Sequence, residues 1–112
     1  MIEHKGIFYY SCTEIAKMIN EPDEDFKPVA DKFRQVYDKP NNYIYDSYVQ
    51  EKLYKAAEKK YIRHIKYQKR SNHYTYRAYA IDDLMSFLNR PDAKNVGFDK
   101  KSVRNLIVVE AE

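Results

Sequence analysis

Cationic side chains gather in one stretch of the sequence, residues 59–81. This stretch holds seven Lys and Arg residues and no Asp or Glu, whereas residues 1–58 carry a net charge of −3 and residues 82–112 a net charge of −1. A local patch of positive charge on an otherwise acidic chain attracts polyanions. We therefore expect this stretch to bind nucleic acid.

The basic stretch combines two kinds of side chain that suit a nucleic-acid surface. Its Lys and Arg side chains can each neutralise a phosphate and release counterions. Its amides and hydroxyls can hydrogen-bond to phosphates, sugars or base edges. A narrow turn with two cations at its tip also fits a minor groove, where A·T-rich DNA is most negative. The candidate DNA contacts are Arg63, Lys66, Gln68, Lys69, Arg70, Ser71, Asn72, His73 and Arg77.

The same stretch has a purely structural interpretation. Edge strands carry charge to prevent aggregation between sheets, which would account for a lysine-rich hairpin without any ligand. Its five tyrosines also fit strand and core positions better than base-stacking platforms, which matter mainly for single strands. We favour the nucleic-acid interpretation because seven cations without one acid exceed what an edge strand needs.

Nothing in the sequence predicts catalysis, a metal site or a cofactor. Cys12 has no acid–base partner in the pattern and fits a small buried residue. The three histidines lack metal-ligand spacing to cysteines or carboxylates, and the acidic residues 21–25 lack the glycine and distal glutamate of a calcium loop. Only two glycines are present, so no phosphate-cradling loop is expected. We therefore expect that the protein is not an enzyme.

Apolar spacing predicts four helices that position the basic stretch. The first starts at the capping-box pair Ser11 and Glu14 and ends near Asn20. The second starts near residues 27–28 and stops before the turn cluster 39–42. For the third, Asp46 or Ser47 is the expected cap, and for the fourth, which ends at residues 90–91, Asp82. The predicted buried stripes of these last two helices are Val49, Leu53, Ala56 and Ala57, and Leu84, Phe87 and Leu88.

Runs rich in β-branched and aromatic residues predict strands in two places. Residues 6–10 are one candidate strand, and residues 61–67 and 73–79 form a hairpin around a polar turn at 68–72. Pairing Tyr67 with His73 would place Arg63 opposite Arg77. Like charges that face each other across strands destabilise a hairpin unless a phosphate lies near them.

The length of 112 residues predicts one domain, residues 1–90, followed by a tail, residues 91–112. The apolar run 106–109 suggests an extra strand or a dimer contact, although residues 103, 106 and 107 also fit a helical face. No apolar run is long enough to cross a membrane, and no signal-peptide pattern is present. With a single cysteine, this predicts a cytoplasmic protein that does not contact membranes.

The order of three helices, a hairpin and a further helix resembles the winged helix-turn-helix family. Residues 11–18 resemble the opening helix of small excisionase-type and MerR-type DNA-binding domains. Residues 53–62 resemble a recognition helix that runs into the first wing strand, and residues 79–84 resemble the helix after the wing. The resemblance implies an α+β winged helix-turn-helix fold and binding to double-stranded DNA.

Two features depart from the family pattern. Lys59 and Lys60 stand where such families place a glycine at the turn from helix to strand. The outward face of the third helix is also not basic, since it carries Ser47, Tyr48, Glu51, Tyr54, Lys55 and Glu58. This shifts the expected phosphate contacts to the wing and leaves Ser47 and Tyr48 as candidates for base contacts. The wing-heavy charge and the size are similar to small winged-helix accessory proteins of clostridial conjugative plasmids.

These features lead to two functional hypotheses. The first is a small DNA-binding protein of a mobile element, either an accessory factor for conjugative transfer or excision or a transcriptional regulator. Its partners would be double-stranded DNA and either a DNA-processing enzyme or a second copy of the chain. The alternative is a winged-helix protein-interaction module without DNA binding. Retention on heparin or bulk DNA distinguishes the two.

Overall fold

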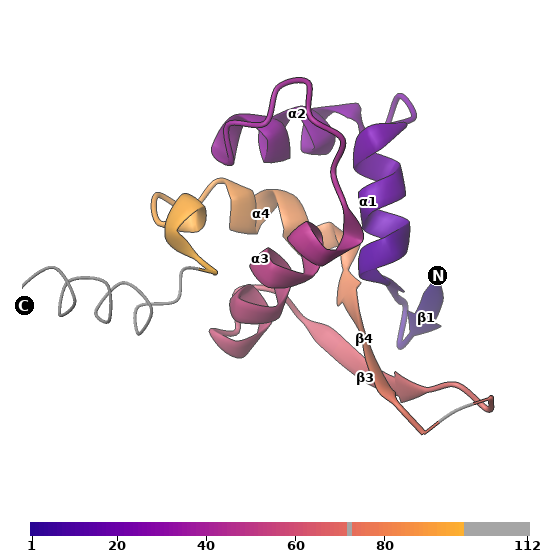
Figure 1. The fold of residues 1–112 in the computed structure, drawn as a ribbon. Coiled ribbons are helices and arrows are strands. Elements are labelled where there is room, and N and C mark those ends of the chain that lie inside the picture. The colour runs from indigo at the N-terminus through magenta and orange to yellow at the C-terminus, as the bar shows by residue number, and fades with distance from the viewer. Residues whose placement is uncertain (72, 98–112) are drawn as a thin grey trace, which may run out of the picture.

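The structure, a computed structural model, describes residues 1–71 and 73–97 and has an α+β fold (Figure 1). It begins with the strands β1 (Ile2–His4) and β2 (Ile7–Tyr10) and continues with the helices α1 (Cys12–Asn20), α2 (Lys27–Val36) and α3 (Asp46–Glu58). A second hairpin follows, and then short helical elements: β3 (His64–Gln68), β4 (Thr75–Ala80), the 3₁₀ turn η1 (Ile81–Asp83), α4 (Leu84–Leu88) and the 3₁₀ turn η2 (Ala93–Asn95). The four expected helices are confirmed.

The strands form one antiparallel sheet in the order β1-β2-β4-β3. β2 joins β4 only at its inner end, through the pairs Tyr9–Ala80 and Tyr10–Tyr79. The outer part of the β3–β4 hairpin therefore extends past the other strands and projects away from the helices (Figure 1). Strand β1 was not predicted; it pairs with β2 around Lys5 and Gly6, whose positive φ angles of 53° and 79° fit a tight hairpin turn.

The main core lies between the four helices and the inner end of β4. The predicted stripes of α3 and α4 are confirmed: every residue in them is buried. Ala93 and Val96 are also buried in this core, so the packed structure continues beyond residue 90, where the sequence placed the start of a tail. The expected strand or dimer contact in residues 103–109 lies outside the described residues.

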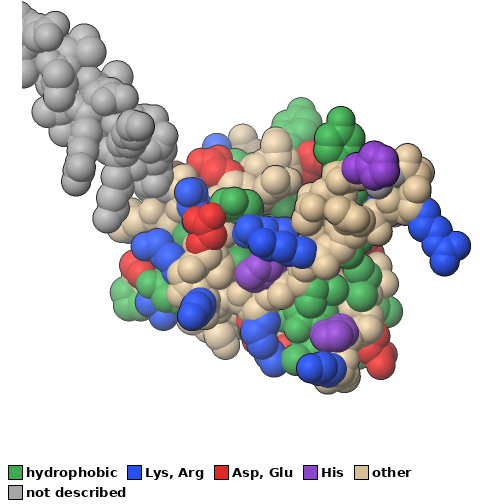
Figure 2. Space-filling view, turned by 90° about the horizontal axis from the view of Figure 1, so that it is seen from below, with side chains coloured by type: hydrophobic (Ala, Val, Ile, Leu, Met, Phe, Trp, Pro, Cys, Tyr) green, Lys and Arg blue, Asp and Glu red, His purple; other side chains and the backbone are tan. Residues whose placement is uncertain are grey.

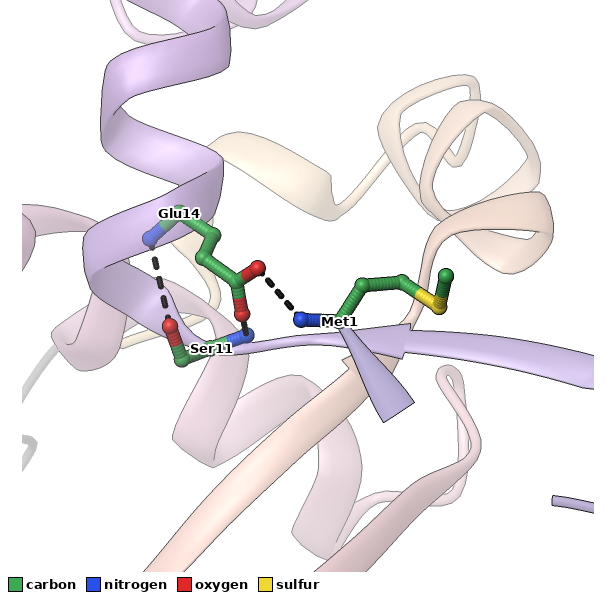
Figure 3. A network of polar contacts seen from close by, with 3 residues as sticks. All are labelled: Met1, Ser11 and Glu14. Carbon is green, nitrogen blue, oxygen red and sulfur yellow. Dashed lines mark hydrogen bonds and ion pairs between the residues drawn. The ribbon is translucent and has the colours of Figure 1, made fainter. Parts of the chain in front are cut away.

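The capping box of α1 is confirmed (Figure 3). The backbone N–H of Glu14 donates to Ser11 Oγ at 3.2 Å, and that of Ser11 donates to Glu14 Oε1 at 3.1 Å. The amino group of Met1 lies 2.6 Å from Glu14 Oε2. Burial raises the pKa of the Glu14 carboxyl, but the hydrogen bonds from the Met1 amine and from Ser11 outweigh it and leave this pKa lowered.

Two other expected caps are wrong. Tyr45 is the N-cap of α3 without a side-chain hydrogen bond, and Asp46 belongs to the first turn of the helix. Asp82 lies in the 3₁₀ turn η1 and caps nothing, while α4 starts one residue later, after Asp83. The expected capping residue therefore lies one position inside α3 in the first case and one position before the N-cap of α4 in the second.

The turn from α3 into the second hairpin is built without glycine. Lys60 adopts φ 63°, the left-handed conformation that glycine would take. The backbone N–H of Tyr61 donates to the Ala56 carbonyl at 2.9 Å, and that of Lys60 donates to Ala57 at 3.0 Å. This is the Schellman hydrogen-bond pattern, so a lysine stands in the position that helices with this ending usually give to glycine.

Candidate nucleic-acid interface

The register of the β3–β4 hairpin differs from the expected one. Tyr67 pairs with Tyr76 rather than with His73, and Lys66 rather than Arg63 lies opposite Arg77. The last pair is Gln68–Thr75, so the connection runs over residues 69–74 instead of 68–72. The expected pair of Arg63 and Arg77 is therefore wrong, and the like charges that face each other across the strands are those of Lys66 and Arg77.

The tip of the hairpin carries most of the predicted contacts. The side chains of Lys66, Gln68, Lys69, Arg70, Ser71 and His73 are all exposed. Figure 2 shows the hairpin extending from the body of the molecule with cationic side chains at its end. The Lys69 ammonium also lies over the Tyr76 ring, 4.7 Å from its centroid. Asn72 lies outside the described residues.

Arg63 lies at the base of the hairpin and is already paired. Its Nε and Nη2 atoms donate to the two carboxylate oxygens of Asp83, each at 2.8 Å, and its backbone N–H donates to the same carboxylate at 2.9 Å. Its charge is therefore neutralised within the protein, which counts against the prediction that Arg63 binds a phosphate. A sequence reading could not find this pair because the two residues are 20 positions apart.

The two faces of the hairpin differ in character. One face carries Ile65, Tyr67, Tyr76 and Ala78, and part of it joins Tyr9 in a small second apolar cluster. Tyr67 and Tyr76 are stacked, with their ring centroids 5.6 Å apart. These tyrosines therefore stabilise the strand pair, in agreement with the structural interpretation of the tyrosine content. The other face carries Lys66, Gln68, Thr75 and Arg77.

This polar face forms one wall of a groove whose other walls are α1 and α3. The groove has a volume of about 690 Å³. The hairpin contributes three polar residues and three tyrosines: Lys66, Thr75, Arg77, Tyr67, Tyr76 and Tyr79. The helix side contributes mainly small polar groups and a tyrosine: Ser11, Cys12, Thr13, Asp46, Gln50 and Tyr54. Its one carboxylate, Asp46, accepts hydrogen bonds from the Thr13 hydroxyl at 3.2 Å and from the Ser47 backbone N–H at 2.8 Å.

Arg77 is held at the wall of this groove by an aromatic ring. Its guanidinium carbon lies 4.0 Å from the centroid of the Tyr54 ring, a close cation–π contact. Its Nη1 atom is shielded from solvent and has no hydrogen-bond partner. A buried donor without an acceptor is costly in a folded protein. An oxygen acceptor placed at this Nη1 group would therefore be favourable.

The exposed face of α3 only partly matches the prediction. Ser47 is exposed, as expected. Tyr48 instead packs against α2, edge-on to Phe33 and Tyr37 at 6.1 and 6.0 Å, and the Lys52 ammonium lies 5.2 Å from its ring centroid. This placement counts against a DNA contact by Tyr48. Its place on the groove side is taken by Gln50, which helical spacing from Asp46 and Tyr54 could have indicated.

A second surface feature was missed by the sequence analysis. Tyr43 and Tyr45, before α3, are 67% and 64% exposed and pack edge-on with ring centroids 4.9 Å apart. The residue between them is fixed, because the Asn20 side chain accepts from the Ile44 N–H and donates to the Ile44 carbonyl, both at 2.8 Å. The two exposed rings are therefore held in place from α1.

Titratable groups around the groove reflect burial and positive charge. Burial, followed by the nearby Asp46, raises the pKa of the Cys12 thiol to about 12, which makes it a weak nucleophile. Burial and the charges of Arg77 and Lys66 lower the pKa of His64. Across residues 1–71 and 73–97, no cluster of three or more His, Cys, Asp or Glu residues could hold a metal ion.

Comparisons with protein-family models, curated proteins and solved structures returned no match to this chain. No described helix combines the length and apolar character needed to cross a membrane.

Proposed function

We propose that the protein is a winged helix-turn-helix protein that binds double-stranded DNA, with the β3–β4 hairpin as its wing and α3 beside it as the helix presented to the DNA. The observation that carries this proposal is the projecting hairpin with exposed cations that no carboxylate neutralises. Within the described part of the chain, Lys66, Lys69 and Arg70 take part in no ion pair.

Some of the cations outside the hairpin are paired with carboxylates. Lys27, Lys52, Lys55, Arg63 and Arg90 each lie within 4.0 Å of a carboxylate, with distances from 2.8 to 3.8 Å. Other described cations, such as Lys17 and Lys94, also form no ion pair, so the distinguishing feature of the hairpin is that residues 59–81 contain no Asp or Glu. Uncompensated positive charge on a narrow projecting element is favourable next to a polyanion and unfavourable without one.

The helix α3 has a different role in this proposal. Its exposed Glu51 and Glu58 are unfavourable beside phosphates, although Glu58 pairs with Lys55 at 3.6 Å. Ser47 and Gln50 near its N-terminal end carry the hydrogen-bonding groups that recognise base edges. The hairpin then supplies most of the affinity, and the first turns of α3 supply sequence preference.

The test is a titration of a labelled duplex at several salt concentrations. Changing Lys69 and Arg70 together to Ala should weaken binding to every sequence and lower the slope of log K against log salt by about 1.8, because each lost phosphate contact removes about 0.9. The matched control is Lys17→Ala with Lys94→Ala, which removes the same charge from exposed sites on α1 and η2. Equal slopes in the parent and the hairpin variant would show that the hairpin is not the contact.

A second candidate function is favoured by the exposed Tyr43–Tyr45 pair. Rigidly held tyrosines of this kind are common at the centre of protein interfaces. A protein-interaction module would use this pair and would not need the hairpin charge. Failure of the parent protein to bind any duplex at low salt would favour this second function over the first.

A further inference from the structure

Lys66 and Arg77 lie directly opposite each other across β3 and β4. Like charges in this position destabilise a strand pair. No described carboxylate forms an ion pair with either residue, and the pair lies on the wall of the groove that the hairpin forms with α1 and α3. The strand pair is therefore less stable in the free protein than the same hairpin with an oppositely charged pair would be.

Further observations describe the acceptors around these two cations, neither of which forms an ion pair with Asp46. Asp46, the one carboxylate in the lining, is occupied by the Thr13 hydroxyl and the Ser47 N–H. The Nη1 atom of Arg77 has no acceptor. His64, which lies on the same strand as Lys66, has a lowered pKa, mainly because of burial and then because of the charges of Arg77 and Lys66.

We propose that the groove between α3 and the hairpin is the binding site, or seat, of one DNA phosphodiester group, which Lys66 and Arg77 bind jointly. This inference rests on the proposed function and adds the site where the DNA backbone contacts the protein. The ring of Tyr54 holds the Arg77 guanidinium at the wall, so the cation is positioned before the DNA arrives.

The proposal makes stability and binding respond in opposite directions to one substitution. Lys66→Glu replaces a like-charge pair by an opposite-charge pair, so the melting temperature should rise by about 1–4 °C. The same change puts a carboxylate into the phosphate seat, so duplex affinity at about 0.1 M salt should fall by roughly tenfold or more. A residue with only a structural role in the strand pair would not show this opposition.

The experiment measures thermal unfolding and duplex binding for the parent, Lys66→Glu and Lys66→Gln. Lys94→Glu is the matched control, because it makes the same charge change at an exposed site on η2, away from the hairpin (Figure 1). We expect Lys66→Gln to lie between the parent and Lys66→Glu in both measurements. We expect Lys94→Glu to weaken binding much less than Lys66→Glu. Lys66→Gln also keeps the test valid if the glutamate variant fails to fold.

The outcomes separate this inference from the proposed function. If the parent binds duplex and Lys66→Glu and Lys66→Gln bind no worse than Lys94→Glu, the phosphate seat is overturned while DNA binding stands. If the parent binds no duplex, the proposed function itself fails. A parallel arm adds inorganic phosphate alone: if it raises the melting temperature of the parent but not of Lys66→Glu while no duplex binds, the seat holds free phosphate and its assignment to DNA is overturned.

Discussion

Arg63 donates two parallel hydrogen bonds from its guanidinium to Asp83, which ties the base of the β3–β4 hairpin to the start of α4. The side-chain hydrogen bonds of Arg63 lower the pKa of the Asp83 carboxyl from its ordinary value of 3.8. Because the folded-state pKa lies below the unfolded-state value, the ionised carboxylate stabilises the fold above about pH 4. This contribution is lost as the pH falls through the lowered pKa.

Asp83→Asn keeps the shape of the side chain and removes its charge. At pH 7 the variant should unfold at a lower temperature than the parent, and the difference should shrink as the pH falls below about 4, where the parent carboxyl becomes protonated. Thermal unfolding from pH 2.5 to 7 provides the measurement. Asp82→Asn, one residue earlier and without such a bond in the described structure, serves as the control. A gap that stays constant with pH would contradict the assignment.

Lys60→Gly should stabilise the protein. Lys60 adopts φ 63°, which costs roughly 1–2 kcal/mol for a residue with a Cβ and nothing comparable for glycine. Glycine also increases the entropy of the unfolded chain, so we expect a net gain of about 0.5–1 kcal/mol in the free energy of unfolding. The control is Lys59→Gly, which removes the same charge at φ −83° and should be neutral or destabilising in the same urea titration. Equal effects of both changes would argue against a strained Lys60.

Leu53→Ala should destabilise the fold by about 2–5 kcal/mol, since Leu53 is 0% exposed in the middle of α3 and its loss leaves a cavity in the main core. Lys55→Ala, on the exposed side of the same helix, should change stability by less than about 0.5 kcal/mol. Chemical unfolding of the two variants and the parent decides the matter. A Leu53→Ala protein with an unchanged unfolding curve would mean that α3 is rotated from the orientation described.

Cys12 should react slowly in the folded protein. Its pKa of about 12 means that the thiolate at pH 8 is at least about 100-fold rarer than in an unfolded chain with an ordinary thiol. Alkylation by iodoacetamide should therefore be slow in buffer and fast in denaturing urea, as followed by mass spectrometry. Rapid labelling of the native protein would indicate an activated thiol and contradict the raised pKa.

Gln50→Ala should change which DNA sequences the protein prefers. If Gln50 reaches a base edge, its loss should cost roughly 1–3 kcal/mol on the preferred site and little on other sites. Tyr48→Phe, on the same helix but packed against α2, should leave the preference unchanged. A binding selection on random duplexes with the parent and both variants measures this. The same preferred sites for all three proteins would limit α3 to non-specific contacts.

The α-helices and the charge of the hairpin follow from the sequence alone because both depend on local features. Apolar residues at helical spacing must face a core, and the Ser11–Glu14 pair satisfies free N–H groups within one turn. The concentration of cations in residues 59–81 is likewise visible without any structure. These local signals predicted the four helices, the hairpin and the surface with the most uncompensated charge.

The tertiary structure decided which residues meet across longer distances. The strand register depends on how Tyr67 and Tyr76 stack and on where β2 joins β4, and a polar turn alone leaves it open. The pairing of Arg63 with Asp83, the packing of Tyr48 against α2 and the position of Arg77 over Tyr54 join residues far apart in the chain. The register determines that Lys66, and not Arg63, lies opposite Arg77. Because side chains on one strand alternate between the two faces of the sheet, the register also determines which side chains share a face.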